Sequence, residues 1–388
     1  MRVLITALVP SHLIPMVPLT WALRAAGHQV LVAGDAELAR CATTAGLDTY
    51  LVGGSELRQR LTRPGAVPMP DRADMDHRTA SEWEEAGERW RTRLGGYIDE
   101  LVSLGQDWEA DLVVTDPVEF GGLITAAALG VPGVVYRWGL DDFTSLLHRQ
   151  AKVQLHDMSK QFAADGLPDP SLIIDPTPAS LLPGGDNTPG LLTRYVPYCG
   201  TAELPDWAVQ RPERPRALLC LGMWYGRLLA EVGELPSGFR HALSACTELG
   251  MDVLFPIAAQ YHPLLGDMPD TVQVVDQVPI GPLMQHTALT VHHGGSGTSL
   301  TSFASGVPQL VLPGGKPFLQ ATGRLVQASG AGRNLPGKTE QQDAGLVRAA
   351  LTELLTREHH RKAARAVCAE IAGLPGPTEL VRTLEGLI

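Results

Sequence analysis

One glycine-rich turn in the sequence, TVHHGGSGTSL (Thr290–Leu300), has residue types suited to binding an anion. An apolar run typical of a strand precedes it, and the segment SGTSLTSFASG is typical of a helix. Glycine lets a ligand approach the backbone, amides at a helix start donate hydrogen bonds, and the helix dipole favours negative charge. We therefore expect a phosphate or diphosphate at the turn His293, Gly294, Gly295, Ser296, Gly297 and Thr298. The alternative is a tight turn that Ser296 caps and that binds no ligand.

A second pair of residues suits proton transfer. His12 lies in LVPSHLIPMVP, on a loop predicted to leave the first strand, and Asp116 ends the strand-like run ADLVVTD. An imidazole accepts a proton near neutral pH, because its ordinary pKa is about 6.5, and a carboxylate can orient the ring. We expect His12 to act as a general base and Asp116 to orient it. The alternative for His12 is a solvated surface position, since the sequence does not show that the two residues meet.

The segment YRWGLDDF contains candidates for contact with an apolar acceptor substrate. Trp138 and Phe143 either line an acceptor pocket or pack into the core at the end of a strand. Asp141 is expected beside the acceptor, and with Asp142 it is also the second candidate for the base. The sequence DMD (Asp74–Asp76) has the spacing of a divalent-metal site for nucleotide sugars, but it lies in a proline-rich insertion and is interpreted as a surface loop.

The elements that must position these residues alternate between strands and helices. Apolar runs predict strands at Val3–Val9, HQVLVAG, ADLVVTD and VPGVVY, and a second series runs through RALLCLG, MDVLFPIA, VQVVDQV, ALTVHHGG and PQLVLPGG. This order predicts two α/β domains with parallel sheets. Ligands bind beyond the carboxyl ends of such strands. The loops expected there are 10–15, 116–121, 222–227, 292–298 and 313–320.

Composition limits the class of protein. The chain has 388 residues, a net charge of -11 and 44% hydrophobic residues, which indicates two soluble domains and argues against nucleic acid or an anionic membrane as partner. Five scattered cysteines without a CxxC pair indicate neither a disulfide framework nor a zinc site, and they fit a reducing cytoplasm. The proline-rich insertion at 53–80 is expected to be a mobile loop, and a linker is expected near 200–215.

Taken together, four segments resemble the actinomycete antibiotic glycosyltransferases that attach nucleotide-activated deoxysugars to polyketide aglycones. They are SHLIPMVPLTWALRAAGHQVLVAG, DPTPASL, RYVPYCGTAELPDW and HHGGSGTSLTSFASGVPQLVLP. The resemblance implies a GT-B fold with two Rossmann-like domains: an acceptor domain at 1–205, a nucleotide-sugar domain at 206–375, and a final helix at 376–388 that returns to the first domain.

The resemblance also implies roles for individual residues. His12 matches the base, Asp116 its orienting carboxylate, and the turn from His293 to Thr298 the diphosphate site. Val278, in DQVPIGPL, matches the segment that touches the nucleobase. His292 precedes His293 on a strand and so faces the other way, and we expect it to be structural.

The sequence departs from the family pattern at two places. Where relatives usually carry Asp-Gln to hold sugar hydroxyls, LPGGKPFLQ has Pro317 and Phe318, so Gln320 or Lys316 is the expected substitute. Met223, in LGMWYG, stands where a serine or threonine often donates to phosphate.

We therefore expect a cytoplasmic, metal-independent, inverting glycosyltransferase. It has no cofactor, consumes a dTDP-linked deoxysugar, and acts on a small polyketide aglycone. The alternatives are a C-glycosyltransferase acting on an aromatic polyketide, a nucleotide-sugar epimerase, and a catalytically silent partner protein. A second copy of the chain and an auxiliary activator protein are the protein partners to consider.

Overall fold

The structure is a computed structural model of the whole chain. It describes residues 1–53, 77–182, 187–222, 229, 233–276, 278–314 and 317–388. The chain divides into two compact units. Unit 1 contains Met1–Thr177, Pro183–Arg194 and Pro375–Ile388, and unit 2 contains Pro178–Leu182 and Tyr195–Leu374.

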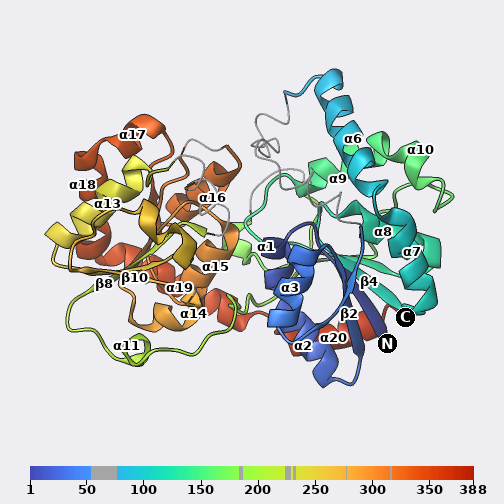
Figure 1. Cartoon of the computed structure of the whole chain (residues 1–388), viewed down its shortest axis with the longest axis horizontal. Helices are drawn as coiled ribbons and strands as arrows, with labels where there is room; N and C mark the ends of the chain where they lie inside the picture. Colours follow the sequence, from blue (N-terminus) through green and yellow to red (C-terminus); the bar gives the residue numbers. More distant parts are fainter. Residues whose placement is uncertain (54–76, 183–186, 223–228, 230–232, 277, 315–316) are drawn as a thin grey trace. The chain divides into compact units, whose positions relative to one another are not determined.

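Unit 1 is built on a seven-stranded parallel sheet of order β3-β2-β1-β4-β5-β6-β7 (Figure 1). The strands are β1 (Arg2–Thr6), β2 (Gln29–Gly34), β3 (Asp48–Leu51), β4 (Leu112–Thr115), β5 (Gly133–Tyr136), β6 (Leu172–Asp175) and β7 (Leu191–Leu192). The helices are α1 (Pro10–Leu13), η1 (Ile14–Met16), α2 (Val17–Ala25), α3 (Ala36–Thr44), α6 (Ala80–Leu94), α7 (Ile98–Asp107), α8 (Phe120–Leu129), α9 (Thr144–Gln154), α10 (His156–Ser159) and α20 (Pro377–Glu385).

Helices cover both faces of this sheet. Figure 1 shows α7 and α8 on one face and α2, α3 and α20 on the other. Val3, Leu4 and Ile5 of β1 are fully buried, because successive side chains of a central strand face opposite helix layers. The helix boundaries follow local rules: Asp35 caps the first amides of α3, and Gly130 ends α8 in the left-handed conformation at φ 71°.

Unit 2 has a six-stranded parallel sheet of order β10-β9-β8-β11-β12-β13. Its strands are β8 (Arg216–Cys220), β9 (Asp252–Pro256), β10 (Val272–Val275), β11 (Leu289–His292), β12 (Gln309–Val311) and β13 (Gly332–Asn334). Its helices are η2 (Ala179–Leu181), α11 (Asp206–Val209), α13 (Ser237–Glu248), η3 (Ala259–Leu264), α14 (Ile280–Leu283), η4 (Met284–His286), α15 (Ser296–Ala304), α16 (Pro317–Ala328), α17 (Lys338–Gln342), α18 (Ala344–Thr356) and α19 (Glu358–Gly373). Helices α13 and α18 bury their apolar residues in one core with β8, β9 and β11.

Some predicted boundaries differ from the observed ones. The first strand ends at Thr6, not at Val9, which is 37% exposed and precedes α1. The segment at 10–15 is helical, not a loop, because Pro10 occupies the first position of α1. The main segment of unit 2 begins at Tyr195, earlier than the boundary expected at 205–206, because the Tyr195 hydroxyl bonds to Gly297 and Thr301 of α15. The return to unit 1 begins at Pro375, next to the expected residue 376.

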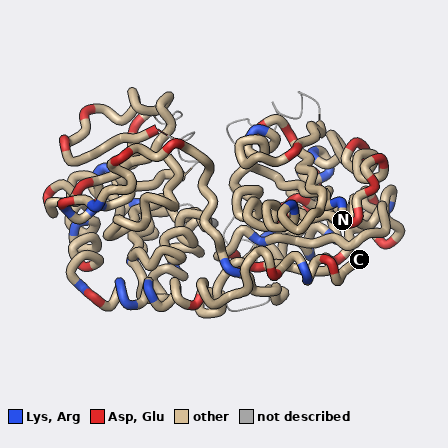
Figure 2. The backbone as a smooth tube through the Cα atoms, turned by 90° about the horizontal axis from the view of Figure 1, so that it is seen from below, with Lys and Arg blue, Asp and Glu red and all other residues tan. Residues whose placement is uncertain are grey.

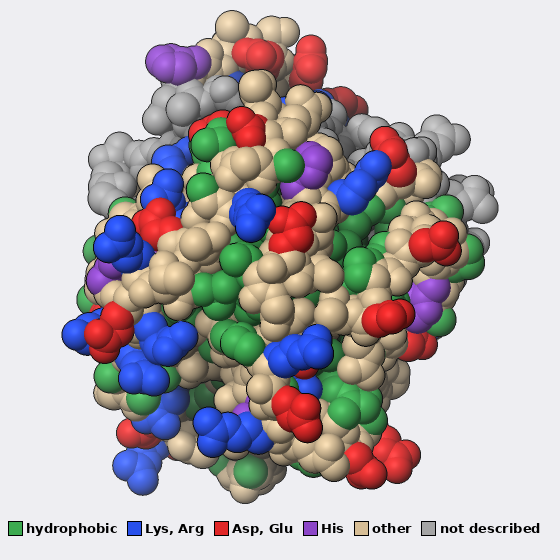
Figure 3. Space-filling model, turned by 90° about the vertical axis from the view of Figure 1, so that its left-hand side faces the viewer, with side chains coloured by type: hydrophobic (Ala, Val, Ile, Leu, Met, Phe, Trp, Pro, Cys, Tyr) green, Lys and Arg blue, Asp and Glu red, His purple; other side chains and the backbone are tan. Residues whose placement is uncertain are grey.

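Charged residues are distributed over both units. Figure 2 shows acidic and basic positions interspersed along each unit, and the face in Figure 3 mixes both signs with apolar side chains. Across the described residues, every helix is too short or too polar to cross a membrane.

Candidate active site

The candidate residues follow the strands at which each sheet reverses its order. In unit 1, β1 and β4 are neighbours, and they lead into α1 with His12 and into Asp116. In unit 2, β8 and β11 are neighbours, and they lead into Gly222 and into the turn at His293. Ligands of open α/β sheets bind at such switch points, beyond the carboxyl ends of the strands. Each unit therefore presents its candidate residues where its topology favours binding.

His12 and Asp116 meet in unit 1. Nδ1 of His12 lies 3.1 Å from Oδ2 of Asp116, whose side chain is fully buried, whereas the His12 side chain is 17% exposed. An ionised carboxylate only accepts hydrogen bonds, so the shared hydrogen sits on Nδ1 and Nε2 carries the lone pair. His12 is thus oriented as a base whose free nitrogen is Nε2.

Backbone amides hold Asp116 in place. Its Oδ2 accepts a hydrogen bond from Leu8 N at 2.6 Å, and its Oδ1 accepts from Val118 N at 2.7 Å and Glu119 N at 3.1 Å. Burial raises the pKa of Asp116, but the charge of His12 and these hydrogen bonds outweigh burial and leave the pKa below its ordinary value. Asp116 therefore stays ionised and can stabilise a protonated His12.

A polar trio of buried Tyr97, buried Glu119 and half-buried Arg93 follows Asp116 through Val118 and Glu119. The Tyr97 hydroxyl donates to Glu119, and Arg93 Nη2 donates to the Val118 carbonyl at 2.8 Å. Burial raises the pKa of Glu119, while the positive charge of Arg93 opposes that rise. This trio was missed by sequence reasoning. A glutamate inside the run PVEFGGLITAAAL, which is otherwise almost entirely apolar, was the signal that could have revealed it.

Trp138 and Phe143 take different positions beside the base. The Trp138 ring stacks on the ring of His12, with centroids 4.2 Å apart and planes 25° apart. Phe143 is 5% exposed and belongs to a core cluster with Trp83, Val118 and Leu147. Phe143 therefore packs into the core, which was the second of the two alternatives. Trp138 is the aromatic residue that contacts the base.

Asp141 faces the protein interior. Its side chain is 1% exposed, and its Oδ1 accepts from Phe143 N at 2.9 Å and Thr144 N at 3.0 Å, at the start of α9. Burial raises its pKa to about 6, against the opposing hydrogen bonds and the charge of Arg137. The expectation that Asp141 contacts an acceptor is not supported by this position, because its oxygens are turned toward the helix start.

The three glycines of the turn in unit 2 differ in how much space surrounds the position of an added Cβ. Gly294 has φ 102°, and a Cβ there would lie 2.7 Å from the Leu319 carbonyl oxygen. A Cβ on Gly295 would lie 2.8 Å from Nε2 of His293. Gly297 is exposed, and the nearest heavy atom to its Cβ would be Tyr195 Oη at 3.9 Å. Packing therefore disfavours a side chain at 294 and 295 but leaves room for one at 297.

The turn does not have the cap that the ligand-free alternative requires. Helix α15 begins at Ser296, its N-cap is Gly295, and no side chain caps it. The reading in which Ser296 caps the turn is therefore wrong. Ser296 is half-buried, whereas Thr298 is buried with its hydroxyl 3.6 Å from Cys220 Sγ.

The two histidines of the turn are both buried and neutral. His292 Nε2 donates to Gln309 Oε1 at 2.9 Å, and its Nδ1 accepts from Gly294 N at 3.0 Å, so it holds the turn from behind. The pKa of His292 is lowered to about 3, mainly by burial and to a smaller extent by the charge of the neighbouring His293. Burial lowers the pKa of His293 to about 4, opposed by a hydrogen bond to the Cys220 backbone.

The remaining predicted donor-site residues are scattered through unit 2. Val278 follows β10 and packs beside Leu283 and Met284. Gln320 is half-buried in the first turn of α16, next to Leu319, whose carbonyl faces Gly294. Met223 and Lys316 lie outside the described residues, as do the DMD sequence, most of the insertion at 53–80 and the side chains of Pro317 and Phe318.

One cluster of metal-ligand side chains occurs in the described residues, away from the turn. It comprises Glu353, His359 and His360 on α18 and α19. His360 is already bonded on both nitrogens, from Nδ1 to the Gly330 carbonyl at 2.7 Å and from Nε2 to Glu353 at 3.1 Å. Glu353 Oε2 also accepts a hydrogen bond from Arg333 Nη1 at 2.6 Å. Hydrogen bonds and ion pairs within the protein therefore account for Glu353 and His360 of this cluster.

Two family models match successive parts of the chain. Residues 21–222 match the family model "Erythromycin biosynthesis protein CIII-like, N-terminal domain", and residues 240–387 match the corresponding C-terminal domain. The chain is 36% identical over 387 residues to an L-demethylnoviosyl transferase of Streptomyces niveus, covering 99% of this chain and 97% of the relative. It is 32% identical over 427 residues to the TDP-daunosamine transferase DnrS of Streptomyces peucetius, covering 100% and 97%.

A solved structure resembles the chain over its full length. The spinosyn rhamnosyltransferase SpnG in complex with thymidine diphosphate has a TM-score of 0.84 and 32% identity, covering 99% of this chain and 100% of that one. The same rhamnosyltransferase has been solved with spinosyn aglycone, at a TM-score of 0.84 and 31% identity. The two parallel sheets described above are those of a GT-B glycosyltransferase fold.

Proposed function

The chain belongs to the erythromycin biosynthesis protein CIII-like family of glycosyltransferases, and on that premise we propose that it transfers a deoxysugar from a thymidine diphosphate (dTDP) carrier to a polyketide aglycone. The observation that carries the proposal is the His12–Asp116 pair beyond the carboxyl ends of β1 and β4. The glycine turn at the start of α15 supports it as the diphosphate site.

The base is Nε2 of His12. It takes the proton of an acceptor hydroxyl as the acceptor oxygen bonds to the anomeric carbon of the sugar. The bond between that carbon and the diphosphate oxygen breaks, so the sugar is transferred with inversion. Asp116 fixes the ring through Nδ1 and stabilises the imidazolium that forms, because it stays ionised.

The leaving diphosphate gains negative charge during the same step. Backbone amides at the start of α15 and the helix dipole favour that charge, and Gly297 lets the phosphate oxygens approach the backbone. In this mechanism the nucleotide sugar is a substrate, and we propose that neither a metal ion nor a prosthetic group takes part.

Release of dTDP tests the function. The purified chain is incubated with a dTDP-deoxysugar, with and without polyketide aglycones, and dTDP and product mass are measured. We expect dTDP release that depends on aglycone and an aglycone mass increased by one deoxysugar, and loss of both in His12→Asn. A changed sugar without aglycone dependence indicates an epimerase. An absence of turnover with nucleotide bound indicates a silent partner protein.

The linkage and the assembly need separate measurements. A glycoside that resists acid hydrolysis indicates C-glycosylation instead of transfer to oxygen.

All five cysteines are free thiols, which supports a cytoplasmic location. The rate per protein molecule, measured over a range of protein concentrations, tests the expectation of a second copy or an auxiliary activator.

A further inference from the structure

Arg137 is a buried charge with several fixed partners. It follows β5 directly, and its side chain is 4% exposed. Nη1 donates to Asp175 Oδ2 at 2.9 Å, and Nη2 donates to Ser145 Oγ and the Thr188 carbonyl, each at 2.9 Å. Nε lies 3.9 Å from Asp141 Oδ2. A buried guanidinium persists only when its donors are paired, so the position of Arg137 is strongly determined by its surroundings.

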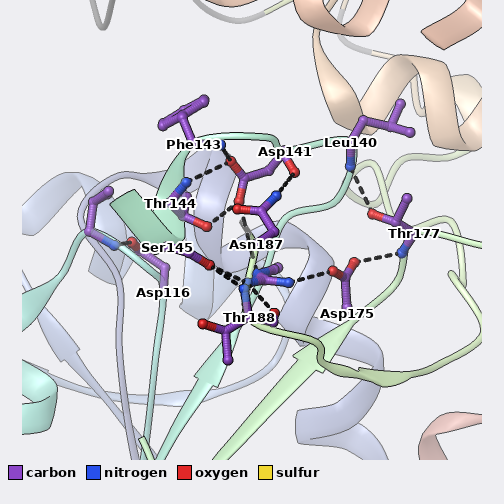
Figure 4. Close-up of polar contacts among 12 residues, drawn as sticks. Asp116, Leu140, Asp141, Phe143, Thr144, Ser145, Asp175, Thr177, Asn187 and Thr188 are labelled. Carbon is purple, nitrogen blue, oxygen red and sulfur yellow. Dashed lines mark hydrogen bonds and ion pairs between the residues drawn. The ribbon is translucent and has the colours of Figure 1, made fainter. Parts of the chain in front are cut away.

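Further hydrogen bonds hold the middle of the segment 137–145. Figure 4 shows Asp141 beside Thr144 and Asn187, and Asp175 beside Thr177. The Asp141 carbonyl accepts from Asn187 Nδ2 at 3.0 Å, and Leu140 N donates to Thr177 Oγ1 at 2.9 Å. Each bond joins the segment to a part of unit 1 that lies later in the chain.

The backbone of this segment is strained where it turns. Gly139 has φ 88° and Leu140 has φ 50°, directly after Trp138. Among the described residues, Leu140 and Glu109 are the non-glycine residues with positive φ. Such conformations persist when the surrounding contacts impose them, and they cluster at functional sites. Here Leu140 N is held by Thr177 Oγ1, and Thr177 N donates to Asp175, which is a partner of Arg137.

Trp138 completes the orientation of the base. Asp116 holds one edge of the His12 ring through Nδ1, and the Trp138 ring covers one face at 4.2 Å. One hydrogen bond leaves the ring free to tilt about that bond, whereas a stacked ring fixes its plane. An indole face also attracts the imidazolium that forms when the base takes a proton.

We propose that Arg137 is a positioning residue for the base: its buried guanidinium fixes the segment 137–145, which holds the Trp138 ring against His12. This rests on the proposed function, in which His12 accepts the acceptor proton. Arg137 touches neither the base nor a substrate, and it acts through its neighbour.

The test has a readout that needs no substrate. In full-length protein with labelled histidine, the His12 Hε1 resonance is identified by its loss in His12→Asn. The Trp138 ring current displaces this resonance upfield. We expect Trp138→Leu and Arg137→Lys to move it downfield, Trp138→Phe to retain part of the displacement, and Arg91→Lys to leave it unchanged. Arg91 is the matched control, because it is an arginine of unit 1 that bonds the Gln154 carbonyl at 2.6 Å, at the far end of α9.

Kinetics supply the second readout. Arg137→Lys is expected to lower kcat about tenfold or more while the KM for the nucleotide sugar stays unchanged, because a slightly misplaced base slows only the chemical step. An unmoved His12 resonance with wild-type kcat in Arg137→Lys would overturn the proposal. If Arg137→Lys does not fold, Ser145→Ala removes one partner of Nη2 without unbalancing charge, and an unmoved resonance there overturns it equally. Failure of the wild type to turn over refutes the proposed function, and the resonance still decides the role of Arg137.

Discussion

Nδ1 of His12 lies 3.1 Å from Oδ2 of Asp116, although 104 residues separate them in the chain. The pairing follows from the sheet order, in which β4 lies directly beside β1 although β2 and β3 intervene in sequence. Both residues come just after strands that share hydrogen bonds, so the fold brings base and carboxylate together without a dedicated motif.

Replacing His12 with alanine should reduce kcat by about 10²- to 10⁴-fold, which is the usual contribution of a general base. Affinity for dTDP, measured by calorimetry, should stay near wild type, because His12 belongs to unit 1 and the glycine turn to unit 2. Wild-type turnover in His12→Ala, together with an inactive Asp142→Asn, would assign the base to the 141–142 segment.

Asp116→Asn should lose less activity than His12→Ala, because orientation is only part of the effect. It should also lower the melting temperature. The new amide group meets either Leu8 N or the Val118 and Glu119 amides, all of which donate hydrogen bonds to Asp116 in the structure. Rates and thermal melting measured on the same preparation separate the two effects, and an activity loss equal to that of His12→Ala contradicts the smaller role.

Gly297→Ala should fold normally and bind dTDP about tenfold more weakly, a loss of about 1.4 kcal/mol. The nearest heavy atom to the added methyl group is 3.9 Å away, so only a ligand would meet it. His293→Ala should also weaken binding. Gly294→Ala is the comparison variant and should lower the melting temperature, because φ 102° and the Leu319 carbonyl at 2.7 Å exclude a side chain. Wild-type dTDP affinity in both Gly297→Ala and His293→Ala would remove the diphosphate from this turn.

Asp141→Asn should change how stability depends on pH. The folded state raises the pKa of Asp141 from 3.8 to about 6, so folding favours the protonated form. The stabilising contribution is complete below pH 3.8 and is lost as pH rises toward 6, a change on the order of 3 kcal/mol. Asparagine does not titrate. Urea unfolding at several pH values should therefore show the variant gaining stability relative to wild type between about pH 4 and pH 6. A difference that stays constant with pH contradicts this.

Leu384→Ala should destabilise unit 1 by about 2 to 5 kcal/mol, although the residue lies near the C-terminus. Leu384 is fully buried on α20, which belongs to unit 1 and packs on α2. Calorimetric melting with and without dTDP identifies the transition of unit 1 as the one that nucleotide does not shift. Leu346→Ala on α18, where the side chain is 46% exposed, is the control and should change stability little. An unchanged unit 1 transition in Leu384→Ala would show that α20 is not needed for its stability.

The sequence predicted the strands that appear as apolar runs, including the edge strand β10, and it missed β3, β6, β7 and β13. β1, β4, β8 and β11 read as apolar runs because helices cover both faces of each sheet. β3 is an edge strand on which Tyr50 is 43% and Leu51 58% exposed, so it lacks such a run. β7 and β13 have only two and three residues, and β6 lies between prolines in PDPSLIIDPTP.

The residue types of the candidate site could be predicted from the sequence, but the contacts between those residues could not. His12, Asp116 and the glycine turn follow strands, so the rule for carboxyl ends points to them. Trp138 stacks on His12 directly before the turn at Gly139 and Leu140, and φ 50° at a leucine cannot be read from sequence. Arg137 was visible as a charge at the end of the run VPGVVYR, but its partners come from later segments of unit 1.

The return of residues 375–388 to unit 1 limits how hybrid enzymes can be made from this chain. A chimaera that exchanges the whole C-terminal half at a single junction would import a foreign α20, whose apolar face was selected against a different α2. Two junctions, near Arg194 and near Leu374, would exchange the main segment of unit 2, leave its short segment Pro178–Leu182 in place, and keep Leu380, Val381 and Leu384 with their own partners. Recombination between relatives meets the same constraint, so donor specificity is expected to move between them as an internal cassette.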